Sequence, residues 1–296
     1  LAAASEGWIS MVYLNFKAYA QTGAWISGST DIFNLIDQIL LAPLSERQQE
    51  FLILIGITDG FTAEEAAWLW QQPDTEELLG FLSQSNAFIT RNENGVYRYH
   101  HMLRQCVRQK FSGLPADRQA AAYARLGDWH LSRQEYVGAE LSYHRAGAWG
   151  KLLDALSIDC GKSLGSEYGE MLYQWSVECP IPLLREHPDA VLVLMHKLFA
   201  FQHVPEMLRL KEILLKSLET STSLTEQERQ DYLGECELVM SFLKYNDISG
   251  MSAHQRNACA MMSRFSRCID LDSVWTFGAP SVLMMYHRTV GGLEHE

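Results

Sequence analysis

The chain has 296 residues, of which 47% are hydrophobic, so it is able to bury a core and is not intrinsically disordered. Its 36 acidic and 24 basic side chains give a formal net charge of −12, which argues against general binding to nucleic acids or anionic membranes. The sequence has neither the apolar run of about 18 residues that a transmembrane helix requires nor a secretory leader. We therefore expect a cytoplasmic protein. Because the sequence begins at Leu1 within a helical pattern, we also expect a fragment of a longer protein.

Residues 1–24 carry apolar side chains at helical spacing, which predicts the end of a helix, and residues 23–29 predict a linker after it. A small unit with helices and two strands follows over residues 31–111. Its first helix is indicated by an apolar stripe on one face, formed by Ile32, Leu35, Ile36, Ile39 and Leu40.

Two capping patterns predict where the next helices of this unit begin. Ser45 and Gln48 form a capping box in front of an apolar helical pattern, and Thr62 and Glu65 repeat it. A further helix is expected near residues 76–84.

The pattern then changes to that of a β-hairpin. Residues 88–90 and 96–99 are rich in β-prone side chains, and a loop that ends in Gly95 separates them. Another helix is expected from about His101 to Phe111. Three helices, a hairpin and a closing helix are the layout of a winged helix.

A winged helix often binds DNA, but the charges of this one argue against it. Residues 31–112 contain eleven acidic side chains and six basic ones, and the candidate recognition helix, Thr62–Trp70, has two glutamates and no base. Because basic contacts to phosphate supply most non-specific affinity for DNA, we expect a structural or regulatory winged helix.

From about residue 116 onward the sequence predicts helices only, and one stretch fits a tetratricopeptide repeat. Its first helix has Tyr123, Leu126, Gly127 and His130 at the pattern positions, and its second has Ala139, Tyr143 and Ala146. The closing proline of the pattern is replaced by Lys151. A generic helical hairpin therefore stays open as the alternative.

Later repeats are degenerate. A helix pair is expected over residues 189–220, another helix at Thr225 with Glu228 in the capping-box position, and a further helix at Ser252 with Gln255. The starts at 189 and 225 are close to one helix-pair repeat apart. Because such repeats bury their faces only by stacking, we expect the array to continue beyond Glu296.

The sequence offers no convincing catalytic or metal site. Residues 160–163 resemble the tail of a phosphate-binding loop, but Leu156 stands where its first glycine is required, so we interpret them as a turn between helices. His100 and His101 are adjacent and point apart on a helix, which disfavours a shared metal ion. Irregular spacing predicts reduced thiols without a metal or disulfide role for Cys106, Cys160, Cys179, Cys236, Cys259 and Cys268. We therefore expect no enzyme.

Three stretches together resemble one family. These are Glu6-Gly7-Trp8-Ile9-Ser10, the run from Tyr97 to Arg104 (YRYHHMLR), and the run from Trp275 to Leu283 (WTFGAPSVL). In this order, with a tetratricopeptide-like hairpin between the last two, they are similar to the MalT-type regulators, the large ATP-dependent members of the LuxR family. The resemblance implies the end of a helical lid domain at residues 1–29, a winged helix at 30–112 and a helical-repeat sensor at 113–296.

The resemblance also implies a function. Such proteins activate transcription through an ATP-binding module, a winged helix, a sensor of a small-molecule or protein inducer, and a C-terminal DNA-binding domain. ATP or ADP, self-association and DNA binding then belong to the parent protein, and this chain carries no cofactor of its own. In related nucleotide switches, a histidine at the position of His100 contacts the β-phosphate of ADP, which implies a nucleotide-sensing role. The alternative is that His100 and Tyr99 only cap the junction between hairpin and helix. A further alternative for the whole chain is an interaction scaffold without a nucleotide switch.

Overall fold

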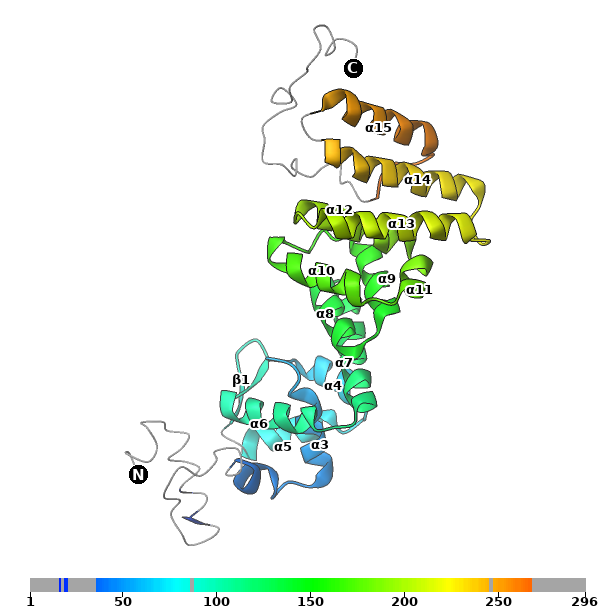
Figure 1. The fold of residues 1–296 in the computed structure, drawn as a ribbon. Coiled ribbons are helices and arrows are strands. Elements are labelled where there is room, and N and C mark those ends of the chain that lie inside the picture. Colours follow the sequence, from blue (N-terminus) through cyan, green and yellow to red (C-terminus); the bar gives the residue numbers. More distant parts are fainter. Residues whose placement is uncertain (1–15, 17–18, 21–35, 86–87, 245–246, 268–296) are drawn as a thin grey trace. The chain divides into compact units, whose positions relative to one another are not determined.

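The computed structural model describes residues 16, 19–20, 36–85, 88–244 and 247–267. They form two compact units, of which the first ends at Trp129 and the second begins at His130. The prediction of a mostly helical chain with one small hairpin is confirmed for these residues (Figure 1). The predicted lid segment 1–29, Ile32, Leu35 and the motif at 275–283 lie outside the described residues.

The first unit contains a winged helix followed by most of one long helix, whose last residues belong to the second unit. Its elements in chain order are η1 (Asp37–Leu41), α3 (Glu46–Ile55), α4 (Ala63–Trp70), α5 (Thr75–Ser85), β1 (Ile89–Arg91), β2 (Tyr97–Tyr99), α6 (His101–Ser112) and α7 (Ala116–Ser132). The predicted capping box of α3 is confirmed, because the Ser45 hydroxyl accepts from Gln48 N and the Gln48 side chain accepts from Ser45 N. Thr62 caps α4 by accepting from Glu65 N at 3.1 Å.

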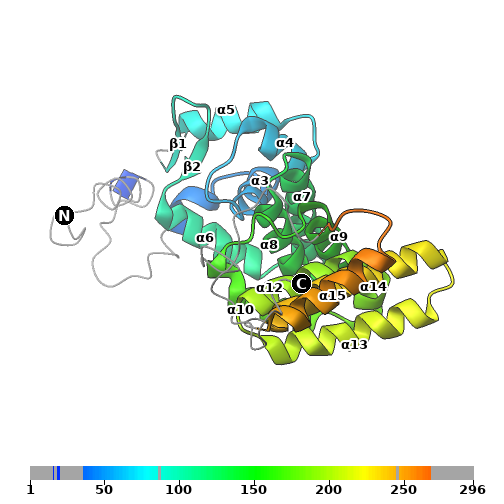
Figure 2. The same cartoon turned by 90° about the horizontal axis from the view of Figure 1, so that it is seen from above.

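The hairpin pairs β1 with β2 in antiparallel register, with Ile89 opposite Tyr99. Each strand begins one residue later than the sequence predicted, at Ile89 and at Tyr97. Phe61 adds a third strand position, since it exchanges backbone hydrogen bonds of 3.0 and 2.8 Å with Tyr97. Figure 2 shows the hairpin beside α5. The order of α3, Phe61, α4, α5 and hairpin is that of a winged helix.

A single apolar core holds the first unit together. Side chains of α3 and α6 meet where Gly56 ends α3, and a Cβ atom on Gly56 would lie 2.3 Å from Val107 Cγ2. Glycine therefore allows α6 to approach α3 closely. Ala122 and Leu126 of α7 are buried in the same core, so α7 packs on the winged helix.

The second unit is built from successive helices without a strand among its described residues. They are α8 (Tyr136–Ala146), α9 (Trp149–Asp159), η2 (Ser166–Tyr168), α10 (Gly169–Glu178), α11 (Ile181–Glu186), α12 (Pro188–Ala200), α13 (Val204–Thr220), α14 (Glu226–Ser241), η3 (Phe242–Lys244) and α15 (Ile248–Met261). Consecutive helices pack in pairs, α8 with α9, α12 with α13, and α14 with α15 (Figure 1). The tetratricopeptide positions Ala139 and Tyr143 are buried in this unit's core.

Two predicted helix starts in this unit have different outcomes. The capping box of Thr225 and Glu228 is confirmed and starts α14. The predicted start at Ser252 is wrong, because α15 begins at Ile248. The Asp247 carboxylate caps it by accepting from Gly250 N at 3.1 Å, and Ser252 lies one turn inside the helix.

Polar contacts in the second unit recur at a nearly constant distance along the chain. The partners are 30 to 34 residues apart in the contacts of Ser176 with Glu206, Asp231 with Ser263, Lys197 with Leu164, and Gln227 with Met261. This separation is close to the length of a helix-pair repeat. These four contacts therefore join segments about one repeat apart, as in stacked repeats.

Candidate functional site

His100 lies at the junction of the hairpin and α6, directly after β2 and before the first residue of the helix. Its backbone N–H donates to Phe88 O at 2.7 Å, and its carbonyl accepts from Arg104 N at 3.0 Å. The half-buried ring packs edge-on against Phe88, with 5.3 Å between ring centroids. His100 thus fixes the start of α6 through its backbone, while its side chain makes no capping hydrogen bond.

Burial and the neighbouring ring of His101 lower the pKa of His100. A lowered pKa favours the neutral imidazole near pH 7. The neighbouring Tyr99 is buried and donates its hydroxyl to Leu52 O at 3.3 Å, so it joins the hairpin to α3.

The surface that a DNA-binding winged helix would use is acidic here. α4 and α5 form the helix-turn-helix, and its second helix, which reads DNA in such motifs, is α5 rather than the predicted α4. Both begin with two glutamates, and neither contains Lys or Arg. Like α4, α5 therefore offers no basic side chain for contacts to phosphate.

The basic side chains of α6 are already paired with acids of the same unit. Arg104 and Arg108 both contact the Asp59 carboxylate, at 2.9 and 3.0 Å, and Lys110 contacts Asp37 at 2.7 Å. These pairs neutralise the positive charge of α6 and fasten it to the segments before α3 and α4.

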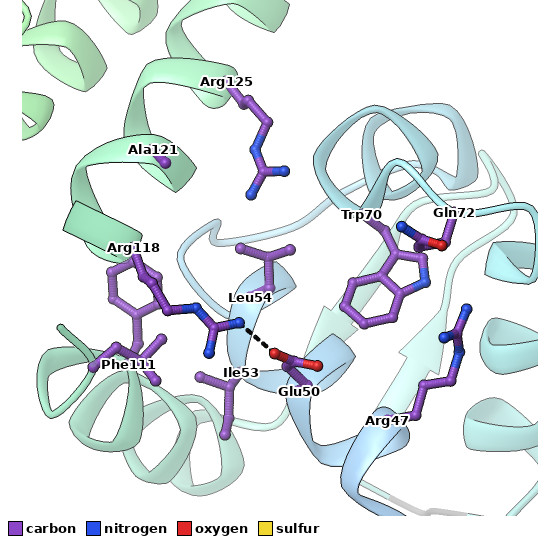
Figure 3. A pocket seen from close by; sticks show the side chains of 11 residues that line it. Arg47, Glu50, Ile53, Leu54, Trp70, Gln72, Phe111, Arg118, Ala121 and Arg125 are labelled. Carbon is purple, nitrogen blue, oxygen red and sulfur yellow. Dashed lines mark hydrogen bonds and ion pairs between the residues drawn. The ribbon is translucent and has the colours of Figure 1, made fainter. Parts of the chain in front are cut away.

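A pocket with a volume of about 360 Å³ opens where α7 packs against α3 and α4 (Figure 3). Ile53, Leu54, Phe111 and Leu114 supply apolar lining, and Trp70 borders the space from α4. Its polar side chains are Arg47, Glu50, Gln72, Arg118 and Arg125. The lining therefore carries three guanidinium groups and one carboxylate.

The three arginines of the pocket differ in their partners. Arg47 contacts Asp74 at 2.5 Å, and the hydrogen bonds from Arg47 and Trp70 lower the pKa of Asp74 to about 2. Arg118 pairs with the Glu50 carboxylate. Arg125 donates to the amide oxygen of Gln71 at 3.2 Å, and its buried Nε atom has no hydrogen-bond acceptor among the described residues. Burial and the nearby charge of Arg118 lower the pKa of Arg125.

In the second unit, residues 160–163 form a turn between helices, as interpreted from the sequence. Cys160 and Gly161 have positive φ angles of 52° and 67°. The Asp159 carboxylate accepts from Ser163 N and Ser163 Oγ at 2.8 and 2.9 Å. An acidic side chain therefore occupies the backbone amide and the hydroxyl of Ser163, which a phosphate would otherwise contact.

The second unit also buries one carboxyl group in its core. Glu140 of α8 is 0% exposed, and neither of its oxygens has a hydrogen bond to a described residue. Burial, with a further contribution from Asp159, raises the pKa of Glu140 to about 8, against the opposing charge of Lys197. Glu140 is therefore mostly protonated near pH 7.

The sequence analysis identified His100 but neither the pocket nor Glu140. A signal for the pocket was present, since Arg118 and Arg125 are seven residues apart and share one face of α7. Within the described residues, no cluster of His, Cys, Asp and Glu could hold a metal ion. No helix of this part of the chain is long and apolar enough to cross a membrane.

Residues 36–120 match the family model of the MalT winged helix domain. No curated protein and no solved structure matches the chain significantly. The matched range includes the hairpin and His100 and extends into α7. It confirms the resemblance for the winged helix, which contains the motif from Tyr97 to Arg104.

Proposed function

We propose that this chain, which contains a MalT-type winged helix domain at residues 36–120, is the central regulatory fragment of a LuxR-family transcriptional activator. It relays the state of an inducer and of a nucleotide to the DNA-binding domain of the parent protein. The match of the winged helix is the observation that carries this proposal. The acidic helix-turn-helix supports it, because a winged helix of this charge suits a regulatory role better than contact with phosphates.

In this proposal the chemistry belongs to other parts of the parent protein. ATP or ADP binds to a nucleotide-binding module, DNA binds to a C-terminal domain, and this chain is not an enzyme. The cytoplasm is the proposed location, as for other regulators that contact DNA. The pairing of Arg104 and Arg108 with Asp59 supports a structural use of the basic residues in α6.

The helices from α8 to α15 are the proposed sensor of the inducer and a surface for self-association. Their contacts at separations of 30 to 34 residues support a tetratricopeptide-like array, and stacked repeats commonly present concave binding surfaces. A generic stack of helical hairpins would satisfy the same contacts.

The nucleotide-sensing role of His100 is tested in the full-length parent protein with a transcription reporter. A histidine donates a charge-assisted hydrogen bond to phosphate, so His100→Ala removes a contact that would hold the winged helix in the ADP-bound state. We expect transcription without inducer to rise. Gln105→Ala, at an exposed position of the same helix α6, is the control and is expected to leave basal transcription unchanged.

A scaffold with a purely structural winged helix is the alternative function. The packing of the His100 ring on Phe88 favours it, because a junction residue needs no ligand. Unchanged basal transcription in a folded His100→Ala protein would support the scaffold and contradict the switch.

A further inference from the structure

We propose that the pocket between α3, α4 and α7 binds a small organic anion, with Arg125 and Arg118 contacting its carboxylate or phosphate group and Trp70 covering a flat apolar body. This inference goes beyond the regulatory role and does not depend on it. It assigns a ligand class to a cavity within the first unit.

The local charge favours an anion. The whole chain has a net charge of −12, whereas the pocket lining carries three guanidinium groups against one carboxylate. Arg47 and Arg118 have carboxylate partners in Asp74 and Glu50, but the one side-chain partner found for Arg125 is the neutral amide of Gln71. One positive charge in the pocket is thus left without a counter-charge among the described residues.

The position of Arg125 shows where the anion would bind. Figure 3 shows its guanidinium group reaching from α7 into the space that Trp70 borders. Its Nε–H is buried without an acceptor, and a buried donor without a partner is unfavourable. A carboxylate or phosphate oxygen would accept this hydrogen bond and one from Nη, which is the forked geometry that guanidinium groups favour.

The structure holds this site in place before any ligand arrives. Trp68 Nε1 of α4 donates to the Arg125 carbonyl of α7 at 3.1 Å. The Trp68 ring also packs on Trp129 of α7, with 5.8 Å between the ring centroids. Phe111 packs edge-on against Tyr123 of α7. These contacts fix the backbone that carries Arg125, so binding would require little reordering.

The shape of the pocket limits the ligand to a small molecule. A volume of about 360 Å³ lies at the lower end of small-molecule sites. Ile53, Leu54 and the indole of Trp70 provide an apolar surface, which suits a ring or short hydrocarbon next to the anionic group. A bound molecule would contact α3, α4 and α7 together and so strengthen the attachment of α7 to the winged helix.

The test is isothermal titration calorimetry on the whole 296-residue chain with four probes: phenyl phosphate, benzoate, inorganic phosphate and the neutral benzyl alcohol. We expect phenyl phosphate or benzoate to bind at millimolar concentration, and to bind more weakly as salt is raised. The two aromatic probes distinguish a phosphate ligand from a carboxylate ligand. Weaker binding of inorganic phosphate would show that the apolar wall contributes.

Arg125→Gln is expected to weaken binding of the better aromatic anion by about tenfold or more, because a charged hydrogen bond is lost. Arg98→Gln removes the same charge from an exposed position outside the pocket and is expected to leave affinity unchanged. Arg125→Lys keeps the positive charge but loses the forked pair of guanidinium donors, so it should also weaken binding. This variant takes the place of Arg125→Gln if Arg125→Gln does not fold. No binding by either aromatic anion, equal binding of benzyl alcohol, or unchanged affinity in the folded Arg125 variants would overturn the proposal.

Discussion

The two units of this chain use charged side chains in different ways. In the first unit, ion pairs join distant parts of the sequence, such as Arg118 with Glu50, 68 residues apart, and Arg104 with Asp59, 45 apart. In the second unit, polar contacts recur at 30 to 34 residues. The chain of the winged helix returns to close a single core, whereas these contacts of the array join segments about one repeat apart.

Acids that accept from arginine in the two units include examples with very different burial. In the first unit the Asp59 side chain, which holds two arginines, is 79% exposed, and that of Glu50 is half exposed. In the second unit Glu235 is 1% exposed and accepts from Arg264, Ser266 and the backbone of Arg267. Exposed pairs contribute little to stability, whereas the loss of one partner of a buried acid is costly.

The largest expected effect tests whether the two units are independent. Phe51→Ala creates a cavity in the core of the first unit and Trp175→Ala creates one in the core of the second, because both side chains are fully buried. Each is expected to cost about 3–5 kcal/mol of unfolding free energy in its own unit. Differential scanning calorimetry should show one transition lowered and the other unchanged. If both variants lower a single transition, the units unfold as one, and the comparison fails.

The next largest effect concerns the pH dependence of the second unit. Glu140 keeps its proton up to about pH 8 when folded but releases it near its ordinary value of 4.5 when unfolded. The folded state is therefore favoured at low pH, and this advantage, on the order of a few kcal/mol, is lost as the pH rises through 8.

The interval from pH 6.5 to 8 isolates Glu140. Burial lowers the pKa of His196 to about 4, so His196 makes stability rise with pH only from about 4 to 6.5. Urea unfolding between pH 6.5 and 8 should show falling stability for the natural chain and a weaker slope for Glu140→Met. An equal slope in both proteins would show that Glu140 is ionised in the fold.

A smaller effect on stability is expected when one buried acid and one exposed acid are replaced. Glu206 accepts from Ser176 Oγ and in forked geometry from Arg209 Nε and Nη2. Glu206→Gln is expected to cost about 1–3 kcal/mol. Asp59→Asn, at its exposed position, should cost about 1 kcal/mol or less and lose its effect in high salt. Urea titrations at low and high salt measure both, and equal costs would remove the proposed difference between the units.

The smallest effect uses a matched pair of glycines in each unit. Gly95 of the hairpin loop and Gly147 after α8 have φ angles of +77° and +64°, so alanine there should cost about 1 kcal/mol. Gly80 of α5 and Gly150 of α9 are helical, and no atom would obstruct an added Cβ. Alanine at these two positions should stabilise by about 0.5–1 kcal/mol. Thermal melting of the four variants measures the differences, and opposite signs would mean that local backbone preference does not control these sites.

The elements that the sequence predicted well depend on neighbouring residues. The capping boxes at Ser45 and Thr225 and the turn at Gly95 were found because their donors, acceptors and backbone angles lie within a few positions. The start of α15 was misplaced because Ser252 also offered a local pattern, and the competing Asp247 carboxylate made the hydrogen bond.

The sequence by itself thus determined the helical class, the hairpin, the acidic character of the helix-turn-helix and the family motif around His100. Only the tertiary structure decided that Phe61 pairs with the hairpin and that Arg47, Trp70 and Arg125 line one pocket. It also decided that Glu140 is buried near Asp159 and Lys197. The reason is that burial, desolvation and charge pairing arise between side chains tens of residues apart, and their strength depends on how the helices pack.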